Sequence, residues 1–223
     1  MAKEEILTLN QRQFLEFASL TDYIHRNFYL TGGTALACFY LRHRLSEDLD
    51  FFNEKDEVNL ELLSRILGKF EKKIKISKIE QRSIFGIHNF FFHFPDKKIL
   101  KVDFSYYPFT RIQKGTKFKN IAIDSDYDIA VNKVHTIYTQ PRARDFIDLY
   151  FLIKEKGYLL TDLILKAKAK FDWHIDPVQL GIQLLKAKEV KDFPFLLKEI
   201  DHQEWQDFFV GQAKQLEKKI FKD

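Results

Sequence analysis

Two aspartates separated by a single residue, Asp48 and Asp50, are the clearest sign of chemistry in this sequence. In a β-strand, residues i and i+2 project from the same face, so both carboxylates are directed at one point while Leu49 turns toward the core. Carboxylates that converge repel one another, and a hard divalent cation such as Mg²⁺ relieves that repulsion. The pair therefore predicts a metal site, although most Asp-x-Asp pairs in soluble proteins lie on solvated strand edges.

A third acid, Asp103, lies in the run ILKVDFSYY between the apolar residues Val102 and Phe104. Three acids on two adjacent strands can hold two metal ions about 3.5–4 Å apart, the arrangement used for in-line phosphoryl displacement. One ion would activate the attacking hydroxyl, and the other would hold a triphosphate and its leaving group. Alone, Asp103 would be read as a surface residue of a half-buried strand, but together the acids predict phosphoryl transfer.

A glycine pair, Gly32 and Gly33, follows a short apolar run and precedes a helical pattern. The N–H groups at a helix start attract anions, and glycine lets a phosphate approach the backbone closely. Thr34 could add a hydroxyl, and Arg44 and Ser46 could supply further donors just ahead of the acids. We predict these five residues as nucleotide-binding, although a glycine pair before a helix most often makes only a tight turn.

The elements that must position these residues divide the chain into two halves. Helical or strand-like spacing is predicted for the ranges 10–26, 28–30, 32–42, 48–52 and 60–73, followed by β-rich runs bounded by turn residues. From residue 125 onward the pattern is helical. We therefore expect an α+β fold with a core domain over residues 1–124. A helical domain over residues 125–223 is expected to pack on this core and to contribute to the active site.

Two runs, GGTAL at residues 32–36 and HRLSEDLDFF at residues 43–52, resemble the signature of the nucleotidyltransferase AbiEii/AbiGii toxin family. That family belongs to the DNA polymerase β-type nucleotidyltransferase superfamily. The run KVDF at residues 101–104 is similar to its second motif, and DIAVNKVHTIYTQPRARDFIDLYFL, from residue 128, resembles its third and fourth motifs. The resemblance implies a polymerase β-like core with a mixed sheet, followed by a C-terminal helical bundle.

Particular roles follow from this resemblance. The three acids would bind Mg²⁺, as two ions, with Asp103 also a candidate base for the incoming hydroxyl. Lys133 would reach the triphosphate. Either Asp145 or Asp148 would be the fourth-motif acid, which orients the acceptor or Lys133. The two aspartates are three residues apart and so share a helix face. However, the same segment also reads as an amphipathic helix with a solvated charged face.

We therefore predict a Mg²⁺-dependent nucleotidyltransferase that moves a nucleoside monophosphate from an NTP to an acceptor and releases pyrophosphate. The resemblance implies the toxin of a bacterial toxin–antitoxin or phage-defence pair. It also implies tRNA or another RNA end as acceptor and a cognate antitoxin encoded nearby. The alternatives are transfer to a small molecule, as antibiotic-modifying enzymes do, transfer to a protein side chain, and a non-catalytic nucleotide- or RNA-binding module. The presence of all three acids argues against the last.

The composition agrees with a globular protein. The 223 residues are 45% hydrophobic and 30% charged, and 23 phenylalanines predict an aromatic core. The net charge of +4 is compatible with an anionic partner. The single cysteine, Cys38, leaves no internal disulfide and favours a reducing compartment. The sequence shows neither a signal-like N-terminus nor a stretch near the ~20 apolar residues of a membrane span, so we expect a cytoplasmic protein without a membrane partner.

Overall fold

The computed structural model describes residues 6–220, with the side chains of residue 73 and residues 217–220 left aside. Residues 1–5 and 221–223, which the sequence analysis assigned to the two expected domains, lie outside the described residues. No helix in the described part of the chain is long and apolar enough to cross a membrane.

The chain folds into two compact units. The first comprises Met1–Tyr40 and Ser46–Ser125, and the second comprises Leu41–Leu45 and Asp126–Asp223. A short segment from early in the sequence therefore belongs to the helical second unit. The chain passes from one unit to the other three times, at residues 40–41, 45–46 and 125–126.

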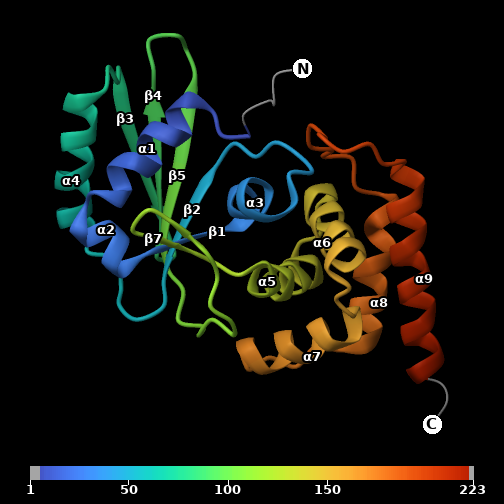
Figure 1. Ribbon diagram of the computed structural model, residues 1–223. Coiled ribbons are helices and arrows are strands. Elements are labelled where there is room, and N and C mark those ends of the chain that lie inside the picture. Colours follow the sequence, from blue (N-terminus) through green and yellow to red (C-terminus); the bar gives the residue numbers. More distant parts are fainter. Residues whose placement is uncertain (1–5, 221–223) are drawn as a thin grey trace. The chain divides into compact units, whose positions relative to one another are not determined.

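A mixed sheet, seven-stranded in the described residues, forms the first unit, with the order β3-β4-β5-β2-β1-β7-β6 (Figure 1). The strands are β1 Tyr29–Thr31, β2 Leu49–Asn53, β3 Lys78–Ile84, β4 Ile87–His93, β5 Ile99–Tyr106, β6 Lys117–Phe118 and β7 Ile121–Ile123. β2 runs parallel to β5, and β1 runs parallel to β7, whereas the other neighbours are antiparallel. The predicted α+β class with a mixed sheet is confirmed.

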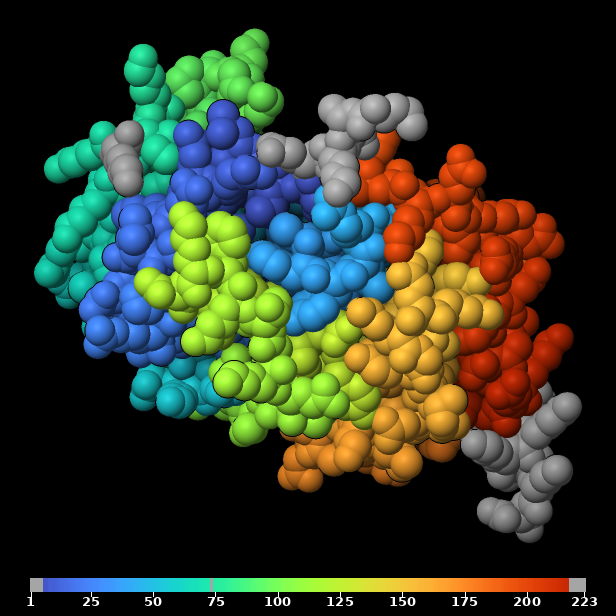
Figure 2. Space-filling view, viewed as in Figure 1, coloured from blue at the N-terminus to red at the C-terminus, as the bar shows by residue number. Residues whose placement is uncertain are grey.

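The helices of the first unit are α1 Leu9–Ser19, α2 Asp22–Asn27, α3 Gly32–Leu36 and α4 Leu60–Lys73. Helix α3 continues as a π-helix over Ala37–Leu41, whose last residue is the first of the segment Leu41–Leu45. Helices α1, α2 and α4 cover one face of the sheet (Figure 1). Phe14 of α1 is fully buried there, with its ring centroid 5.1 Å from Phe70, 5.5 Å from Phe92 and 6.0 Å from Phe51. The core is aromatic, as the phenylalanine content predicted. The turn between β4 and β5, coloured green, projects from this unit in the space-filling view (Figure 2).

The second unit is helical, as predicted. Its helices are α5 Asp126–Thr139, α6 Ala143–Lys156, α7 Leu160–Phe171, α8 Pro177–Leu185, the 3₁₀ turn Lys186–Lys188 and α9 His202–Ile220. Phe146 of α6 stacks on Trp205 of α9 at 6.0 Å, and both are fully buried. The segment Leu41–Leu45 is joined to this unit by backbone hydrogen bonds, in which Leu45 N donates to Phe195 O (2.9 Å) and Leu197 N donates to His43 O (2.8 Å).

Candidate active site

The three predicted acids come together on the first unit. Asp50 of β2 and Asp103 of β5 are register partners on adjacent parallel strands, and Asp48 directly precedes β2. Strand alternation buries Leu49 completely against the core and leaves Asp50 partly exposed on the other face. The alternation read from the sequence therefore matches the arrangement of the strands.

A lysine that the sequence analysis did not single out bridges two of these acids. Lys101 Nζ lies 2.5 Å from Asp103 Oδ2 and 3.2 Å from Asp48 Oδ2. Burial by itself lowers the pKa of Lys101, but its contacts with Asp103 and Asp48 outweigh burial and raise that pKa, so the ammonium is charged at neutral pH. Asn89 of β4 donates from Nδ2 to the other Asp103 oxygen, Oδ1, at 2.7 Å. The spacing of Lys101 and Asp103, two residues apart on a strand, indicates that they share a face of β5, but the sequence gives no sign of the contact with Asp48.

The donor set fits Mg²⁺ in chemical type, because carboxylate oxygens are the protein ligands that this ion prefers. In the arrangement observed, however, Lys101 joins Asp48 and Asp103. Among the described residues, no group of three or more His, Cys, Asp or Glu side chains is arranged to hold a metal ion. Binding of Mg²⁺ by the acids therefore stays a prediction, and it requires the contacts of Lys101 to change.

The glycine segment packs directly against the acids. Gly32 has a left-handed φ of +74°, and a Cβ atom added there would lie 2.1 Å from Asp50 Oδ2. Gly33 lies in the first turn of α3, and Thr34 is buried, with its Oγ1 donating a hydrogen bond to the carbonyl oxygen of Asp48. The segment therefore holds both acids in place, which adds a structural role to the nucleotide contact predicted for it.

The loop that leads into the acids is held by a residue from α1. The side chain of Gln11, which is buried, donates from Nε2 to the carbonyl oxygens of Ser46 (2.8 Å) and Glu47 (3.0 Å). Gln11 also closes the capping box of α1 with Thr8, so its side chain is fixed at both ends. Ser46 is thus held just ahead of the acids through its backbone carbonyl group, which accepts the hydrogen bond from Gln11.

Replacing Gly32 with alanine is expected to lower the transfer rate by about 100-fold, because the new Cβ displaces the Asp50 carboxylate. Gly86→Ala is the matched control, since Gly86 has a φ of +77° and no atom within 4 Å of an added Cβ. Both variants are expected to lose about 1–2 kcal/mol of stability from the left-handed backbone. Nucleotidyl transfer and thermal unfolding would be measured on both, and equal losses of activity would contradict the role given to Gly32.

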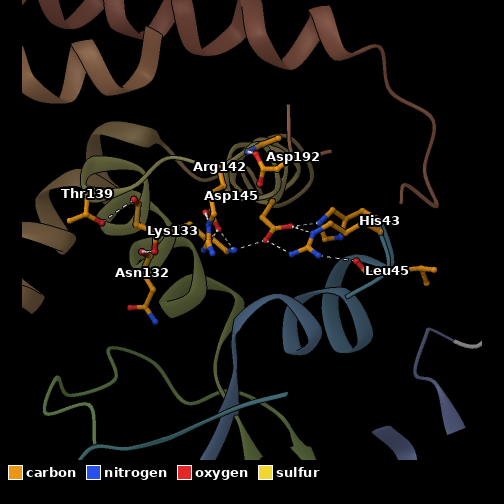
Figure 3. Close-up of polar contacts among 12 residues, drawn as sticks. His43, Leu45, Asn132, Lys133, Thr139, Arg142, Asp145 and Asp192 are labelled. Carbon is orange, nitrogen blue, oxygen red and sulfur yellow. Dashed lines mark hydrogen bonds and ion pairs between the residues drawn. The ribbon is translucent and has the colours of Figure 1, made fainter. Parts of the chain in front are cut away.

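A buried charge network lies within the second unit (Figure 3). Its centre is Asp148 of α6, which is fully buried. Arg44 donates to both of its oxygens, from Nε to Oδ1 at 2.6 Å and from Nη2 to Oδ2 at 2.8 Å. His43 contributes Nε2 at 2.8 Å from Oδ1. Two neighbouring residues of the segment Leu41–Leu45 thus contact one carboxylate. The two hydrogen bonds from Arg44 form a bidentate pair, which is among the strongest kinds of hydrogen bonding in proteins.

Lys133 of α5 joins this carboxylate to the next one. Its Nζ lies 2.7 Å from Asp148 Oδ2 and 2.6 Å from Asp145 Oδ1. Arg142 Nε donates to Asp145 Oδ2 at 2.8 Å. Both aspartates are fully buried, so the alternative in which this helix presents them on a solvated face is wrong. Both contact Lys133, and this is the geometry expected of residues that orient it.

The protonation of the network follows from its burial. Burial lowers the pKa of His43 and outweighs the hydrogen bond to Asp148, so the imidazole is neutral at physiological pH. Its Nδ1 is buried with no hydrogen-bond partner among the described residues, which agrees with an Nε2–H tautomer. The carboxylates of Asp145 and Asp148 are then balanced by Lys133 and the guanidinium groups around them.

Arg44 was predicted to contact the nucleotide from a position beside the first two acids. The structure instead gives its guanidinium the partners Asp148 and, through Nη1, the carbonyl oxygen of Leu45 at 2.9 Å. The side chain is only 3% exposed. Sequence reasoning could not have found this pairing, because Arg44 and Asp148 are 104 residues apart.

A mixed sheet with an Asp-x-Asp pair beside a third aspartate on the neighbouring strand, followed by a helical unit, defines the class of nucleotidyltransferase folds. JHP933 from Helicobacter pylori has this fold, with a TM-score of 0.60 and 23% identity, covering 98% of this chain and 94% of that one. MenT4, a nucleotidyltransferase toxin from Mycobacterium tuberculosis H37Rv, is similar with a TM-score of 0.54 and 15% identity, covering 92% of this chain and 82% of that one.

The sequence identifies the family. Residues 20–222 match the family described as nucleotidyl transferase AbiEii toxin, type IV toxin–antitoxin system. The chain belongs to this family, as the sequence motifs predicted, and is a nucleotidyltransferase. An uncharacterized protein from Aquifex aeolicus is 31% identical over 150 residues, which cover 66% of this chain and 68% of that protein.

Proposed function

We propose that this nucleotidyltransferase uses Mg²⁺ and an NTP to add a nucleoside monophosphate to an RNA end, most plainly that of a tRNA, and releases pyrophosphate. In this proposal it acts in the cytoplasm as the toxin of a defence pair whose antitoxin is encoded by a neighbouring gene. The observation that carries the proposal is the register pairing of Asp50 with Asp103, with Asp48 joined to Asp103 through Lys101.

The acids of the first unit supply the reaction centre. Asp48, Asp50 and Asp103 would hold Mg²⁺, with two ions expected. Gly32 and Gly33 lie beside these acids and would contact the phosphates of the nucleotide. Bound there, the metal would lower the charge of the triphosphate and acidify the attacking hydroxyl. Asp103 is the proposed base for that hydroxyl, and Asn89 orients its carboxylate by donating to Oδ1.

Lys133 is the proposed triphosphate contact in the second unit. An ammonium group has three N–H donors, and two of those of Lys133 point to Asp145 and Asp148. The third donor remains for a phosphate oxygen. The two buried aspartates hold the pKa of Lys133 above its usual value although burial alone would lower it, so the group keeps its charge.

An RNA acceptor is supported by the net charge of +4, which favours association with a polyanion. The family's place in toxin–antitoxin systems supports the toxin role and an antitoxin partner. Small-molecule and protein acceptors are the alternatives that the experiment has to separate.

The test is a transfer assay with purified protein, Mg²⁺, total bacterial RNA and each α-labelled NTP in turn. The Asp48→Ala/Asp50→Ala variant serves as the inactive control. Label on a tRNA-sized band with the wild type alone would support the proposal and identify the nucleotide. Label on protein, or in the small-molecule fraction only, would overturn the RNA acceptor in favour of the corresponding alternative.

A further inference from the structure

The ammonium of Lys101 lies between two of the three acids that would hold a metal ion. Its ammonium contacts Asp48 Oδ2 and Asp103 Oδ2, one oxygen from each of two proposed metal ligands. It reaches them because strand alternation places Lys101 and Asp103 on one face of β5. The acids are therefore already neutralised in part by a cation that belongs to the chain.

Two cations compete for the same oxygens. Mg²⁺ binds carboxylate oxygens directly, and an ammonium group at hydrogen-bond distance from those oxygens opposes a second positive charge beside it. Both oxygens of Asp103 already accept a hydrogen bond, Oδ1 from Asn89 and Oδ2 from Lys101, and the Oδ2 contact brings a positive charge to the oxygen that a metal ion would share with Asp48. A metal ion held by Asp48 and Asp103 must therefore displace the ammonium of Lys101.

Displacement is feasible here because the pair is near solvent. The side chain of Lys101 is 30% exposed, that of Asp48 is 36% exposed and that of Asp103 is 12% exposed, so the ammonium itself can move into water although Asp103 is largely buried. The ion pair between Lys170 and Asp128 in the second unit is different, since those side chains are 1% and 0% exposed. Separation of such a buried pair would leave two unpaired charges without access to water.

We propose that Lys101 is a resident counter-ion of the catalytic acids, which a divalent cation displaces, and that it thereby sets the metal affinity of the site. The inference rests on the proposed function in one respect, the role of the three acids as metal ligands. Without metal, Lys101 keeps the acids paired and limits their mutual repulsion. With metal, its loss of contact lowers the net binding affinity.

The test measures binding of Mn²⁺ alone, as a probe for Mg²⁺, by titration with detection of the free ion by electron paramagnetic resonance. Lys101→Met keeps much of the side-chain length and removes the charge. Lys98→Met is the matched control, because Lys98 lies in the turn between β4 and β5, is 72% exposed and pairs only with Asp96 in the described structure. Both variants change the net charge equally, so a general effect of charge would appear in both.

Lys101→Met is expected to bind Mn²⁺ about tenfold more tightly than the wild type, and Lys98→Met is expected to bind it as the wild type does. Without metal, Lys101→Met should unfold at a lower temperature, and Mn²⁺ should raise that temperature more than in the wild type. Equal or weaker Mn²⁺ binding by Lys101→Met would overturn the inference.

A third variant separates this inference from the proposed function. Adding Asp103→Asn to Lys101→Met should remove the gain in affinity if the acids are the ligands. Mn²⁺ binding that is unaffected by Asp103→Asn in either background would overturn the metal role of the acids, and the inference with it. Binding that depends on Asp103 but is unchanged by Lys101→Met would overturn the inference alone.

Discussion

Replacing Asp148 with alanine is expected to lower the free energy of unfolding by about 3–5 kcal/mol, the effect of removing one partner from a buried ion pair. The substitution would remove the carboxylate that accepts hydrogen bonds from Nε and Nη2 of Arg44. The same carboxylate also contacts Lys133. Arg44 is only 3% exposed, so its guanidinium has little access to water as a substitute.

Urea unfolding followed by circular dichroism would measure this loss. Asp207→Ala is the matched control, because Asp207 pairs with Lys188 on the exposed surface and its removal should change the midpoint little. A double variant, Arg44→Met/Asp148→Leu, should recover part of the stability by removing both charges together. Equal stabilities of Asp148→Ala and the wild type would show that the network does not hold the unit together.

The contribution of Asp148 should also depend on pH. Burial alone raises its pKa, but Arg44 and Lys133 outweigh burial and hold the pKa well below the ordinary value of 3.8. The stabilisation is then fully present above that ordinary value and is lost as the pH falls through the lower pKa of the folded state. The difference in stability between wild type and Asp148→Ala should therefore stay constant from about pH 7 to about pH 5 and narrow as the pH falls below about 4.

Replacing Asp50 with asparagine is expected to reduce nucleotidyl transfer on the order of 10³-fold while leaving the fold intact. The substitution keeps the shape of the side chain against Gly32 and removes one charge from the three acids. Because it also removes repulsion between like charges, the unfolding temperature should stay the same or rise slightly.

Rates of single-turnover transfer and thermal unfolding would be measured together for this variant. Asp56→Asn is the control, since Asp56 is an exposed acid shortly after β2 with the same change of charge. Transfer by Asp50→Asn within about tenfold of the wild-type rate would exclude Asp50 from the reaction centre.

The parts of this protein that could be predicted from sequence depend on local patterns. The helix over residues 60–73 was predicted with the bounds that α4 has, because its apolar spacing is regular. The placement of Leu49 in the core beside Asp50 followed from strand alternation. By contrast, β7 has only three residues, Ile121–Ile123, and such a short apolar run carries no distinct period.

The parts that could not be predicted depend on contacts between distant residues. A lysine on a strand ordinarily reads as a solvent-facing residue, so Lys101 gave little sign that it bridges Asp103 and Asp48, which lies just before β2. The burial of Asp145 and Asp148 could not be predicted either, because the charged groups that balance them come partly from the distant segment Leu41–Leu45. A charged residue is ordinarily predicted to lie on the surface, because charged side chains are rarely buried without a partner. Its burial can be predicted only when the oppositely charged partner is known.

The placement of Leu41–Leu45 in the second unit has a consequence for how the protein is made. A ribosome synthesises Arg44 about a hundred residues before Asp148, and the backbone partners of His43 and Leu45 at residues 195–198 emerge still later. The first unit therefore reaches the end of its own sequence, at Ser125, while this segment awaits elements not yet translated. Completion of the charge network around Lys133 is thus expected only after α6, which carries Asp145 and Asp148, has been synthesised, and the backbone contacts of the segment at residues 195–198 form later still.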